Sequence, residues 1–314
     1  MRLDIRYRTV FTYDDVVSES QNEIRACPAT DDRQQLLAYR VTTSPPSRTL
    51  SYTDYWGTRV DHFGVRDRHI VLEVLAEAAV ETRPRPPIAV MPVLAAAADP
   101  EFRDLHGEFL ERTAHTDWGS AIAGAAARVV ELNGPDLIRV VLAIHGTVGE
   151  LLAYEPGSTD IGQPIEDILA GGRGVCQDYA HLALALCRSV GIPARYVSGY
   201  LFTSDDTTGE ITGDQARVQT HAWFEAAIPG FGWFPLDPTN RLQVGHQHVK
   251  IGHGRDYDDV PPLRGAYAGV GRPRVDAGVE IRRMDPTRQP ATLVQPSMPR
   301  ALEQRRFQER QQQQ

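Results

Sequence analysis

The sequence predicts an α+β fold, in which helices pack on an antiparallel sheet and a small antiparallel β domain comes first. The hydrophobic period changes along the chain: apolar residues alternate with polar ones before residue 83, and recur at three- and four-residue spacings after about Asp99. In this second part the predicted helices precede the predicted strands. That order is typical of an α+β domain rather than of a doubly wound sheet.

The first 83 residues are predicted to form strands. The clearest alternation is at the N-terminus, where one face consists of Leu3, Ile5, Tyr7, Thr9 and Phe11. Further strands are expected at 36–43, 50–56, 58–63 and 69–82, with Gly57 in a tight turn. These short strands with one apolar face indicate a small antiparallel β domain.

A proline-rich connector ends this part, because three prolines fall within residues 84–87. We therefore divide the chain into a β domain at 1–83, a linker at 84–100 and a core with a C-terminal extension at 101–285. The last segment, 286–314, is rich in Gln, Arg and Pro, and its composition predicts disorder.

Three helices and then three strands are expected in the core. The helices are predicted at 117–132, at 135–154 and from about 174 to 190, where Gly191 and Pro193 end the last one. Strands follow at 194–201, 220–228 and 232–236, and another at 274–282. Residues 203–219 are polar and predict a long hairpin loop, and residues 229–232 predict the next hairpin turn.

Composition and charge exclude several classes of function. The chain has 33 Lys and Arg residues against 41 Asp and Glu, a formal charge of −8, and therefore no general electrostatic case for nucleic-acid binding. The longest largely apolar run, residues 88–98, is far shorter than the roughly 18 residues that a membrane helix needs. The N-terminus is charged at alternate positions and has no apolar signal core, so we expect a cytoplasmic protein that binds neither nucleic acid nor membrane.

The three cysteines differ in their predicted surroundings. Cys176 falls in the first turn of a predicted helix, where unpaired N–H groups and the helix dipole stabilise a thiolate. Cys187 follows on the same helix about 16 Å away, too far for a disulfide, and is interpreted as a packing residue. Cys27 lies in a strand-like segment and is interpreted in the same way. Cys176 is therefore the candidate nucleophile, weighed against the common alternative of a buried structural thiol.

A base and an orienting acid are predicted nearby in the fold. His221 begins one strand and Asp237 ends the next, so the hairpin between them brings both to the same end. A thiol nucleophile needs a base of this kind, and the base needs a group that orients it. A lone histidine in an apolar strand is more often structural, but the pairing with Asp237 favours the catalytic interpretation.

Separated blocks of this sequence resemble the bacterial transglutaminase-like proteins. Residues 172–181, 187–188 and 191–200 resemble the core of that family, and residues 221–223 and 237–240 match its other two motifs in order. The N-terminal β segment resembles the family's N-terminal region, and residues 254–260 resemble its C-terminal signature. The resemblance covers roughly residues 1–285.

The resemblance implies a papain-like transglutaminase core with a Cys-His-Asp triad. Cys176 would be the nucleophile, His221 the base and then the acid, and Asp237 the group that orients His221. Attack on an amide or ester carbonyl would give a thioester, with the oxyanion met by the backbone N–H of Cys176 and a second donor. Candidates for that donor are Gln177 and Tyr154.

Four features are expected to border the cleft. They are Trp223, Arg173, Tyr200 and the loop at 203–219.

Three functions are compatible with these residues. The leading one is a cysteine peptidase or amidase acting on a peptide or protein amide, in which water resolves the thioester. The alternative is a protein-glutamine acyltransferase, in which a primary amine does so, and a further alternative is a binding or assembly module without turnover. The oligomeric state is left open.

No cofactor and no metal are expected. His246, His248 and His253 form an H-x-H-x4-H pattern, but no fourth ligand stands at a compelling spacing. Cys176 and His181 would point about 140° apart on a helix, so His181 is interpreted as a packing residue. Asp178 is interpreted as a helix-terminus residue rather than as a second acid. No calcium-loop or nucleotide-binding pattern is found.

Overall fold

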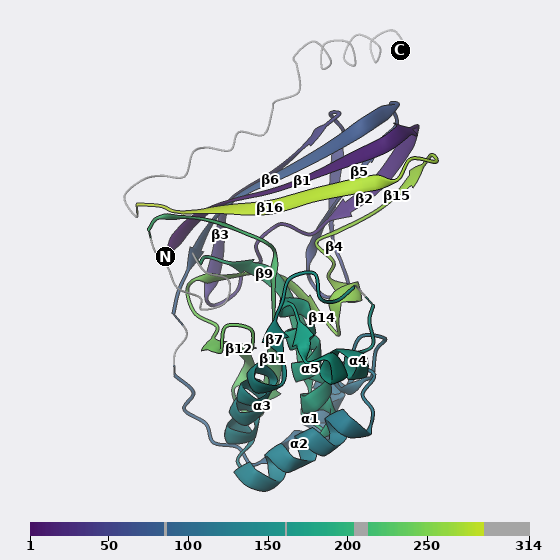
Figure 1. The fold of residues 1–314 in the computed structure, drawn as a ribbon. Coiled ribbons are helices and arrows are strands. Elements are labelled where there is room, and N and C mark those ends of the chain that lie inside the picture. The colour runs from purple at the N-terminus through teal and green to yellow at the C-terminus, as the bar shows by residue number, and fades with distance from the viewer. Residues whose placement is uncertain (85–86, 161, 204–212, 286–314) are drawn as a thin grey trace, which may run out of the picture.

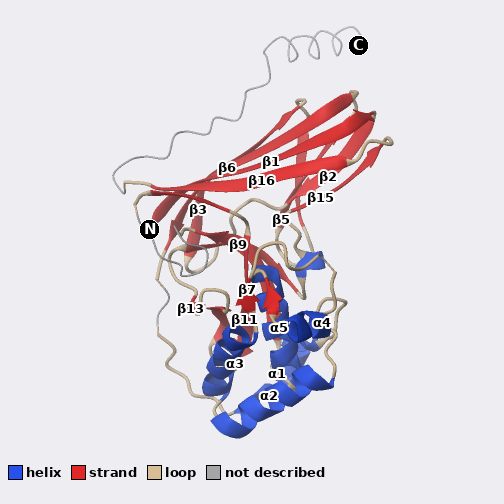
Figure 2. Ribbon diagram, viewed as in Figure 1, coloured by secondary structure: helices blue, strands red, loops and turns tan. Residues whose placement is uncertain are grey.

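The chain folds into a β-rich part and a part in which helices pack on a further sheet (Figure 1). The structure is a computed structural model, and it describes residues 1–84, 87–160, 162–203 and 213–285. The predicted tail at 286–314 and most of the predicted loop at 203–219 lie outside the described residues. The α+β prediction is confirmed: Figure 2 shows strands in the upper part, and helices beside further strands in the lower part.

The larger sheet of the β-rich part has the strand order β10-β16-β1-β6-β3 and is antiparallel throughout. Its N-terminal strands are β1 (Arg2–Val17), β3 (Gln34–Ser44) and β6 (His69–Thr82). The predicted alternation is confirmed along β1, where Leu3, Ile5, Tyr7 and Thr9 are all buried. The other two strands, β10 (Gln215–Val218) and β16 (Pro273–Arg283), come from far downstream in the sequence.

The smaller sheet has the order β15-β2-β5-β4, built from β2 (Glu19–Ile24), β4 (Thr49–Thr53), β5 (Arg59–Val65) and β15 (Leu263–Ala268). Side chains of both sheets meet in one apolar core, which includes Leu72 and Phe63. The sequence analysis missed β2, because its buried positions Ser20 and Asn22 are polar. The residues of β15 and β16, which the sequence analysis assigned to the core with its C-terminal extension, pair here with N-terminal strands.

The third sheet is antiparallel, with the order β13-β12-β11-β9-β14. Its strands are β9 (Ala194–Leu201), β11 (His221–Ile228), β12 (Gly232–Asp237), β13 (Leu242–Gln243) and β14 (His248–Gly254). The strands predicted at 194–201, 220–228 and 232–236 are thus confirmed. The predicted loop is wrong at 215–218, because these residues form β10 and pair with β16.

Helices cover one face of this third sheet. The three predicted helices are observed as α2 (Ser120–Asn133), α3 (Leu137–Leu151) and α5 (Cys176–Ser189). The central helix α5 packs against β11 and β9 and is buried along most of its length, sharing a core with Phe224 and Leu236. Two helices were missed because they are only seven residues long: α1 (Pro100–His106) and α4 (Ile165–Gly171).

The remaining elements are short. Three 3-10 helices are η1 (Leu94–Ala98), η2 (Gly107–Leu110) and η3 (Tyr257–Asp259), and a parallel pair is formed by β7 (Ala153–Tyr154) and β8 (Arg173–Gly174). The segment predicted as a linker thus contains η1. Among the described residues, no helix is both long enough and apolar enough to cross a bilayer.

Candidate active site

The segment that leads into α5 holds Cys176 at the first position of the helix. Gly172 closes α4 in a left-handed conformation with φ of 63°, and β8 then pairs with β7. A side chain on Gly174 would lie 2.8 Å from the Cβ of Asp178, so glycine is required for the approach of that carboxylate. Cys176 is half-buried, and its place in the first turn is the one predicted.

Asp178 fixes this helix end. Its Oδ2 accepts hydrogen bonds from the backbone N–H of Val175 at 2.8 Å and from the hydroxyl of Thr159 at 2.6 Å. Burial raises the pKa of Asp178, and these two hydrogen bonds oppose that effect. The interpretation of Asp178 as a helix-terminus residue is therefore confirmed.

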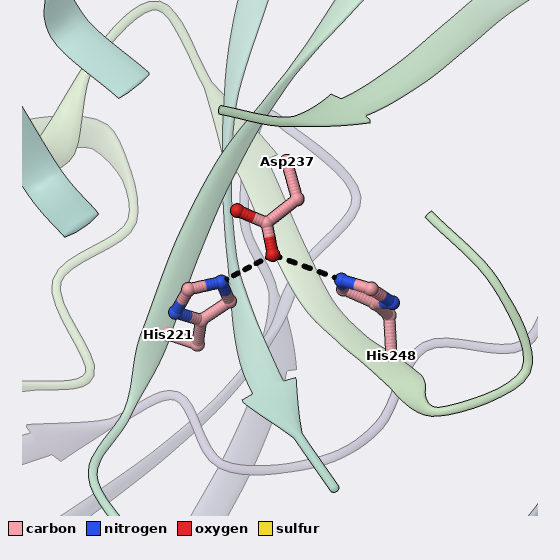
Figure 3. A group of neighbouring side chains, drawn as sticks. All are labelled: His221, Asp237 and His248. Carbon is pink, nitrogen blue, oxygen red and sulfur yellow. Dashed lines mark hydrogen bonds and ion pairs between the residues drawn. The ribbon is translucent and has the colours of Figure 1, made fainter. Parts of the chain in front are cut away.

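His221 and Asp237 meet across the β11–β12 hairpin (Figure 3). The strand register pairs Phe224 with Leu236, which brings the start of β11 beside the end of β12. His221 Nε2 and Asp237 Oδ2 lie 2.8 Å apart, and the Asp237 side chain is completely buried. This contact occupies Nε2 and leaves Nδ1 as the ring nitrogen available to Cys176.

Asp237 is held by donors on both carboxylate oxygens. Oδ1 accepts from the backbone N–H groups of Thr239 at 3.1 Å and Asn240 at 3.3 Å. Oδ2 accepts from the Asn240 amide at 2.9 Å in addition to its contact with His221. Burial alone would raise the pKa of Asp237, but the charge and hydrogen bond of His221, together with the hydrogen bond of His248, hold it well below its usual range. The carboxylate is therefore ionised despite its burial.

The pKa of His221 is raised to about 10. Burial lowers this pKa, but the negative charge of Asp237 and its hydrogen bond to His221 raise it by more, and the nearby Cys176 side chain adds to the rise. The side chains of Cys176, His221 and Asp237 are thus brought together in the order that the sequence analysis predicted. The arrangement suits a protonated His221 ring held between the Asp237 carboxylate and the Cys176 sulfur.

A second histidine reaches the same carboxylate. His248, the first residue of β14, places Nε2 at 3.1 Å from Asp237 Oδ2 and is almost fully buried (Figure 3). Sequence reasoning considered His248 only as part of an H-x-H-x4-H pattern. The pattern does not assemble, since His246 is exposed and His253 packs beside Phe109 with ring centroids 6.4 Å apart. No local signal pairs His248 with Asp237, because the contact depends on β12 and β14, which lie on either side of the β11–β9 pair.

Two groups within the described residues have the spacing of metal ligands. One is His221, Asp237 and His248, and the other is His115, Asp256 and Asp258; in each, the ligand atoms lie within 4.8 Å of one another. The first group coincides with the candidate site, where its atoms already hydrogen-bond to one another. That the protein functions without a metal stays a prediction.

The candidates for the second oxyanion donor lie close to Cys176 in the chain or the fold. Gln177 is half-buried in the first turn of α5, and Tyr154 is half-buried in β7, paired with Gly174. No contact with a substrate tests either of them, so this role stays a prediction for both.

Two residues expected to border the cleft are instead buried. Trp223 is inaccessible to solvent. Its ring fills the space beside Gly199, where an added side-chain carbon would lie 2.5 Å from it. Tyr200 packs in the core of the β-rich part, 6.2 Å from the ring of Tyr7. Arg173 is exposed, as a cleft residue requires, and pairs with Glu155 at 3.1 Å.

The other two cysteines are packing residues, as predicted. Cys27 and Cys187 are buried, and burial raises the pKa of both thiols to about 12. Cys27 follows β2 in a loop rather than lying within a strand. His181 is also buried, accepting from the Tyr257 backbone N–H at 3.2 Å.

The single lysine is withdrawn from solvent. Lys250 Nζ lies 2.8 Å from Glu225 Oε2, and burial lowers the pKa of Lys250 to about 8 while the charge of Glu225 opposes this. Its amine is therefore held inside the protein.

Comparisons with known proteins support the architecture. Residues 124–238 match the Transglutaminase-like superfamily, and residues 3–81 match the Bacterial transglutaminase-like N-terminal region. An uncharacterized protein of Mycobacterium leprae is 36% identical over 283 residues, which cover 90% of this chain and 99% of that protein. A protein-glutamine gamma-glutamyltransferase of Pseudomonas aeruginosa is 32% identical over 114 residues, covering 34% of this chain and 17% of that enzyme.

Among solved structures, a candidate cysteine protease from Cytophaga hutchinsonii has the same fold. It superposes with a TM-score of 0.67 at 22% sequence identity, covering 95% of this chain and 93% of that one. The shared fold extends over both the β-rich part and the helical part.

Proposed function

This chain belongs to the transglutaminase-like superfamily, and we propose that it is a cysteine-dependent hydrolase of amide or ester bonds, acting as a peptidase or amidase. The observation that carries the proposal is the 2.8 Å contact of His221 Nε2 with Asp237, with the Cys176 side chain near enough to raise the pKa of His221. A nucleophile, a base and an orienting acid in this order form the constellation of thiol acyl transfer.

The proposed reaction begins with the thiolate of Cys176. Its sulfur attacks the substrate carbonyl, and the electron pair of the C=O bond moves to the oxygen. When that pair returns, the bond to the leaving group breaks, and His221 gives its proton to the departing amine or alcohol. A water molecule then attacks the thioester, His221 accepts a proton from it, and the acid product leaves the thiolate on Cys176.

The developing oxyanion needs fixed donors. The backbone N–H of Cys176 is at the first position of α5, where the N–H groups have no partner within the helix. The side chain of Gln177 or the hydroxyl of Tyr154 is proposed as the second donor. Asp237 does not take the proton itself; it keeps Nε2 of His221 engaged so that Nδ1 serves Cys176.

Acyl transfer to an amine is the second candidate, supported by the similarity to the Pseudomonas enzyme over 114 residues. Both reactions share formation of the thioester. The acceptor would come from elsewhere, because Lys250 is the one lysine of the chain and is buried against Glu225. A transferase role therefore requires another protein or a small amine.

One experiment separates these functions. The protein is incubated with a peptide library and with a glutamine peptide plus a primary amine, and the products are analysed by mass spectrometry. We expect hydrolysis products that are lost in Cys176→Ala and retained in the matched control Cys187→Ala. Incorporation of the amine would instead favour the transferase, and turnover by Cys176→Ala would refute the nucleophile. If Cys176→Ala changes neither the products formed from these substrates nor the phenotype of cells that carry it, the non-catalytic module is favoured.

We also propose a cytoplasmic location and a peptide or protein amide as the partner. All three cysteines are free, as is usual in a reducing compartment. Cell fractionation with an antibody tests the location, and recovery in the periplasmic or membrane fraction would contradict it.

A further inference from the structure

Asp237 Oδ2 stands between two imidazoles, His221 at 2.8 Å and His248 at 3.1 Å (Figure 3). We propose that His248 is a positioning residue for the proposed hydrolysis: its Nε2–H donates to Asp237 and fixes the carboxylate that orients His221. The inference rests on the proposed function, since it gives His248 a part in that same site.

Gly245 determines which ring nitrogen of His248 carries the proton. The backbone N–H of Gly245 points at Nδ1 of His248 at 3.2 Å, so Nδ1 must be the unprotonated acceptor. The proton of a neutral ring then lies on Nε2 and points at Asp237. The backbone N–H of His248 in turn donates to the Gly245 carbonyl at 3.1 Å, which holds the two residues together.

The same assignment argues against a metal ion between these three residues. A metal would bind the lone pair of Nε2, and Nδ1 would then carry the proton and face the N–H of Gly245. Two donors would confront each other in a buried site, which is costly. The hydrogen-bonded arrangement is therefore favoured over coordination.

His248 is packed inside the protein, which favours its neutral form. Its side chain is 1% exposed, and the edge of Trp223 meets it with ring centroids 5.5 Å apart. Burial lowers the pKa of His248, and the charge of His221 lowers it further, against the hydrogen bond and charge of Asp237. The two histidines thus have opposite roles on one oxygen: His221 is the ring that gains a charge, and His248 remains a neutral donor.

Loss of the His248 donor would free one side of Oδ2. The carboxylate would then keep His221 and the Asn240 amide on that oxygen and could rotate toward the vacated side. His221 would follow, because Oδ2 is the carboxylate oxygen that its Nε2 contacts. A displacement of this kind weakens the interaction between the His221 imidazolium and Cys176.

The rate of Cys176 alkylation by iodoacetamide measures this effect without a known substrate. We expect His248→Leu, which fills the space but donates nothing, to slow alkylation at pH 6 by about tenfold or more. His248→Gln places an amide N–H near the position of Nε2 and should restore the rate to within about threefold of wild type. With a substrate in hand, the same variants should change kcat rather than KM. Thermal unfolding of each variant shows that it is folded.

Two results would overturn the proposal. One is an unchanged alkylation rate in His248→Leu; the other is a His248→Gln variant that unfolds at the wild-type temperature yet is as slow as His248→Leu.

The wild-type protein provides a test that needs no variant. In a sample labelled with 15N-histidine, NMR at neutral pH should show His248 as the neutral tautomer with its proton on Nε2. A proton on Nδ1 would refute the proposal. Failure of the proposed function is distinguishable, because turnover by Cys176→Ala would refute the nucleophile and leave this NMR result unchanged.

Discussion

Replacing Asp237 with asparagine changes one oxygen to an NH2 group in the middle of the proposed site. In the wild type, Oδ2 accepts from His221, His248 and the Asn240 amide, and Oδ1 accepts from two backbone N–H groups. The backbone donors hold the amide oxygen of the variant on the Oδ1 side, so the NH2 group faces His221. His221 can then meet it only with an unprotonated Nε2, which puts the ring proton on Nδ1 toward Cys176. This is the wrong tautomer for a base that must accept a proton from that side.

The expected loss of turnover in Asp237→Asn is large because the substitution removes a negative charge beside His221. The pKa of His221 is about 10, against an ordinary histidine value of about 6.5. The difference corresponds to about 5 kcal/mol in favour of the imidazolium. Cys176 accounts for part of this rise in pKa, but Asp237 contributes through both its charge and its hydrogen bond. In Asp237→Asn the lowering of the His221 pKa by burial should therefore outweigh what remains, so that His221 is neutral at pH 7. We expect turnover to fall roughly 10³- to 10⁴-fold.

Asp237→Asn should also destabilise the fold. The amide leaves the Nε2–H of His248 facing a donor inside the protein, and a broken buried interaction of this kind costs roughly 3 kcal/mol. The matched control is Asp61→Asn in β5, another fully buried aspartate, which accepts from the Tyr39 hydroxyl at 2.7 Å. This control should lose stability while the chemistry at Cys176 stays intact.

The assay is alkylation of Cys176 by iodoacetamide between pH 5 and 8, followed by mass spectrometry of the peptide. The wild type and Asp61→Asn should react quickly at pH 6, whereas Asp237→Asn should react at least about tenfold more slowly, because its thiol lacks a cationic neighbour. Equal alkylation rates in all three proteins, together with wild-type turnover in Asp237→Asn, would refute the role assigned to Asp237.

Four further predictions concern other parts of the molecule. In the native protein iodoacetamide should label Cys176 and spare Cys187, whose pKa burial raises to about 12, and equal labelling would contradict the packing interpretation. Because the pKa of His221 is higher in the folded chain than in the unfolded one, protonated His221 stabilises the fold fully below about pH 6.5, and this contribution is lost as the pH rises toward 10. The free energies of unfolding of the wild type and His221→Gln, measured in urea, should therefore converge over this range. Gly199→Ala should lower the free energy of unfolding by about 1–3 kcal/mol, since the added carbon would meet the Val249 carbonyl oxygen and would lie 2.5 Å from the Trp223 ring; an unchanged urea midpoint would show that both neighbours shift at no cost. Hydrolysis should persist in EDTA, and a loss that zinc or calcium restores would overturn the metal-free mechanism.

The sequence predicted what depends on local pattern. The position of Cys176 followed from a glycine-rich segment before an apolar helix, and the proximity of His221 and Asp237 followed from one hairpin. Both features are contained within short stretches whose hydrophobic period is clear. The α5 helix and the β11–β12 pair are therefore where sequence reasoning and structure agree best.

Contacts between distant strands were not predictable in this way. His248 and Asp237 stand eleven residues apart, on strands at opposite sides of the pair β11 and β9, and no periodicity relates them. The burial of Trp223 depends on the absence of a side chain at Gly199, one strand away. The pairing of β16 with β1 joins positions such as Ile281 and Ile5, which only the folded chain brings together.

These long-range contacts give the β-rich part a structural role in the proposed site. The side chain of Gln34 donates to the Lys250 carbonyl at 2.8 Å and accepts from the Lys250 N–H at 2.8 Å, which anchors β14 just after His248. On the other side, β10 pairs with β16 and ends three residues before His221. Both histidines that contact Asp237 therefore stand on strands tethered to the β-rich part.

The matches to the family models do not point to His248. The matched core ends at residue 238, and the N-terminal match ends at residue 81, so His248 lies in neither. Its neighbours are nevertheless bound by the N-terminal part, since the Thr82 hydroxyl donates to the His246 carbonyl and the Arg33 guanidinium reaches the Val244 carbonyl at 3.5 Å. Under the proposal, one part presents the nucleophile, and a strand bound to the other part fixes the carboxylate. The N-terminal β region is then a structural support of the proposed catalytic geometry, and its presence beside the core has a physical reason.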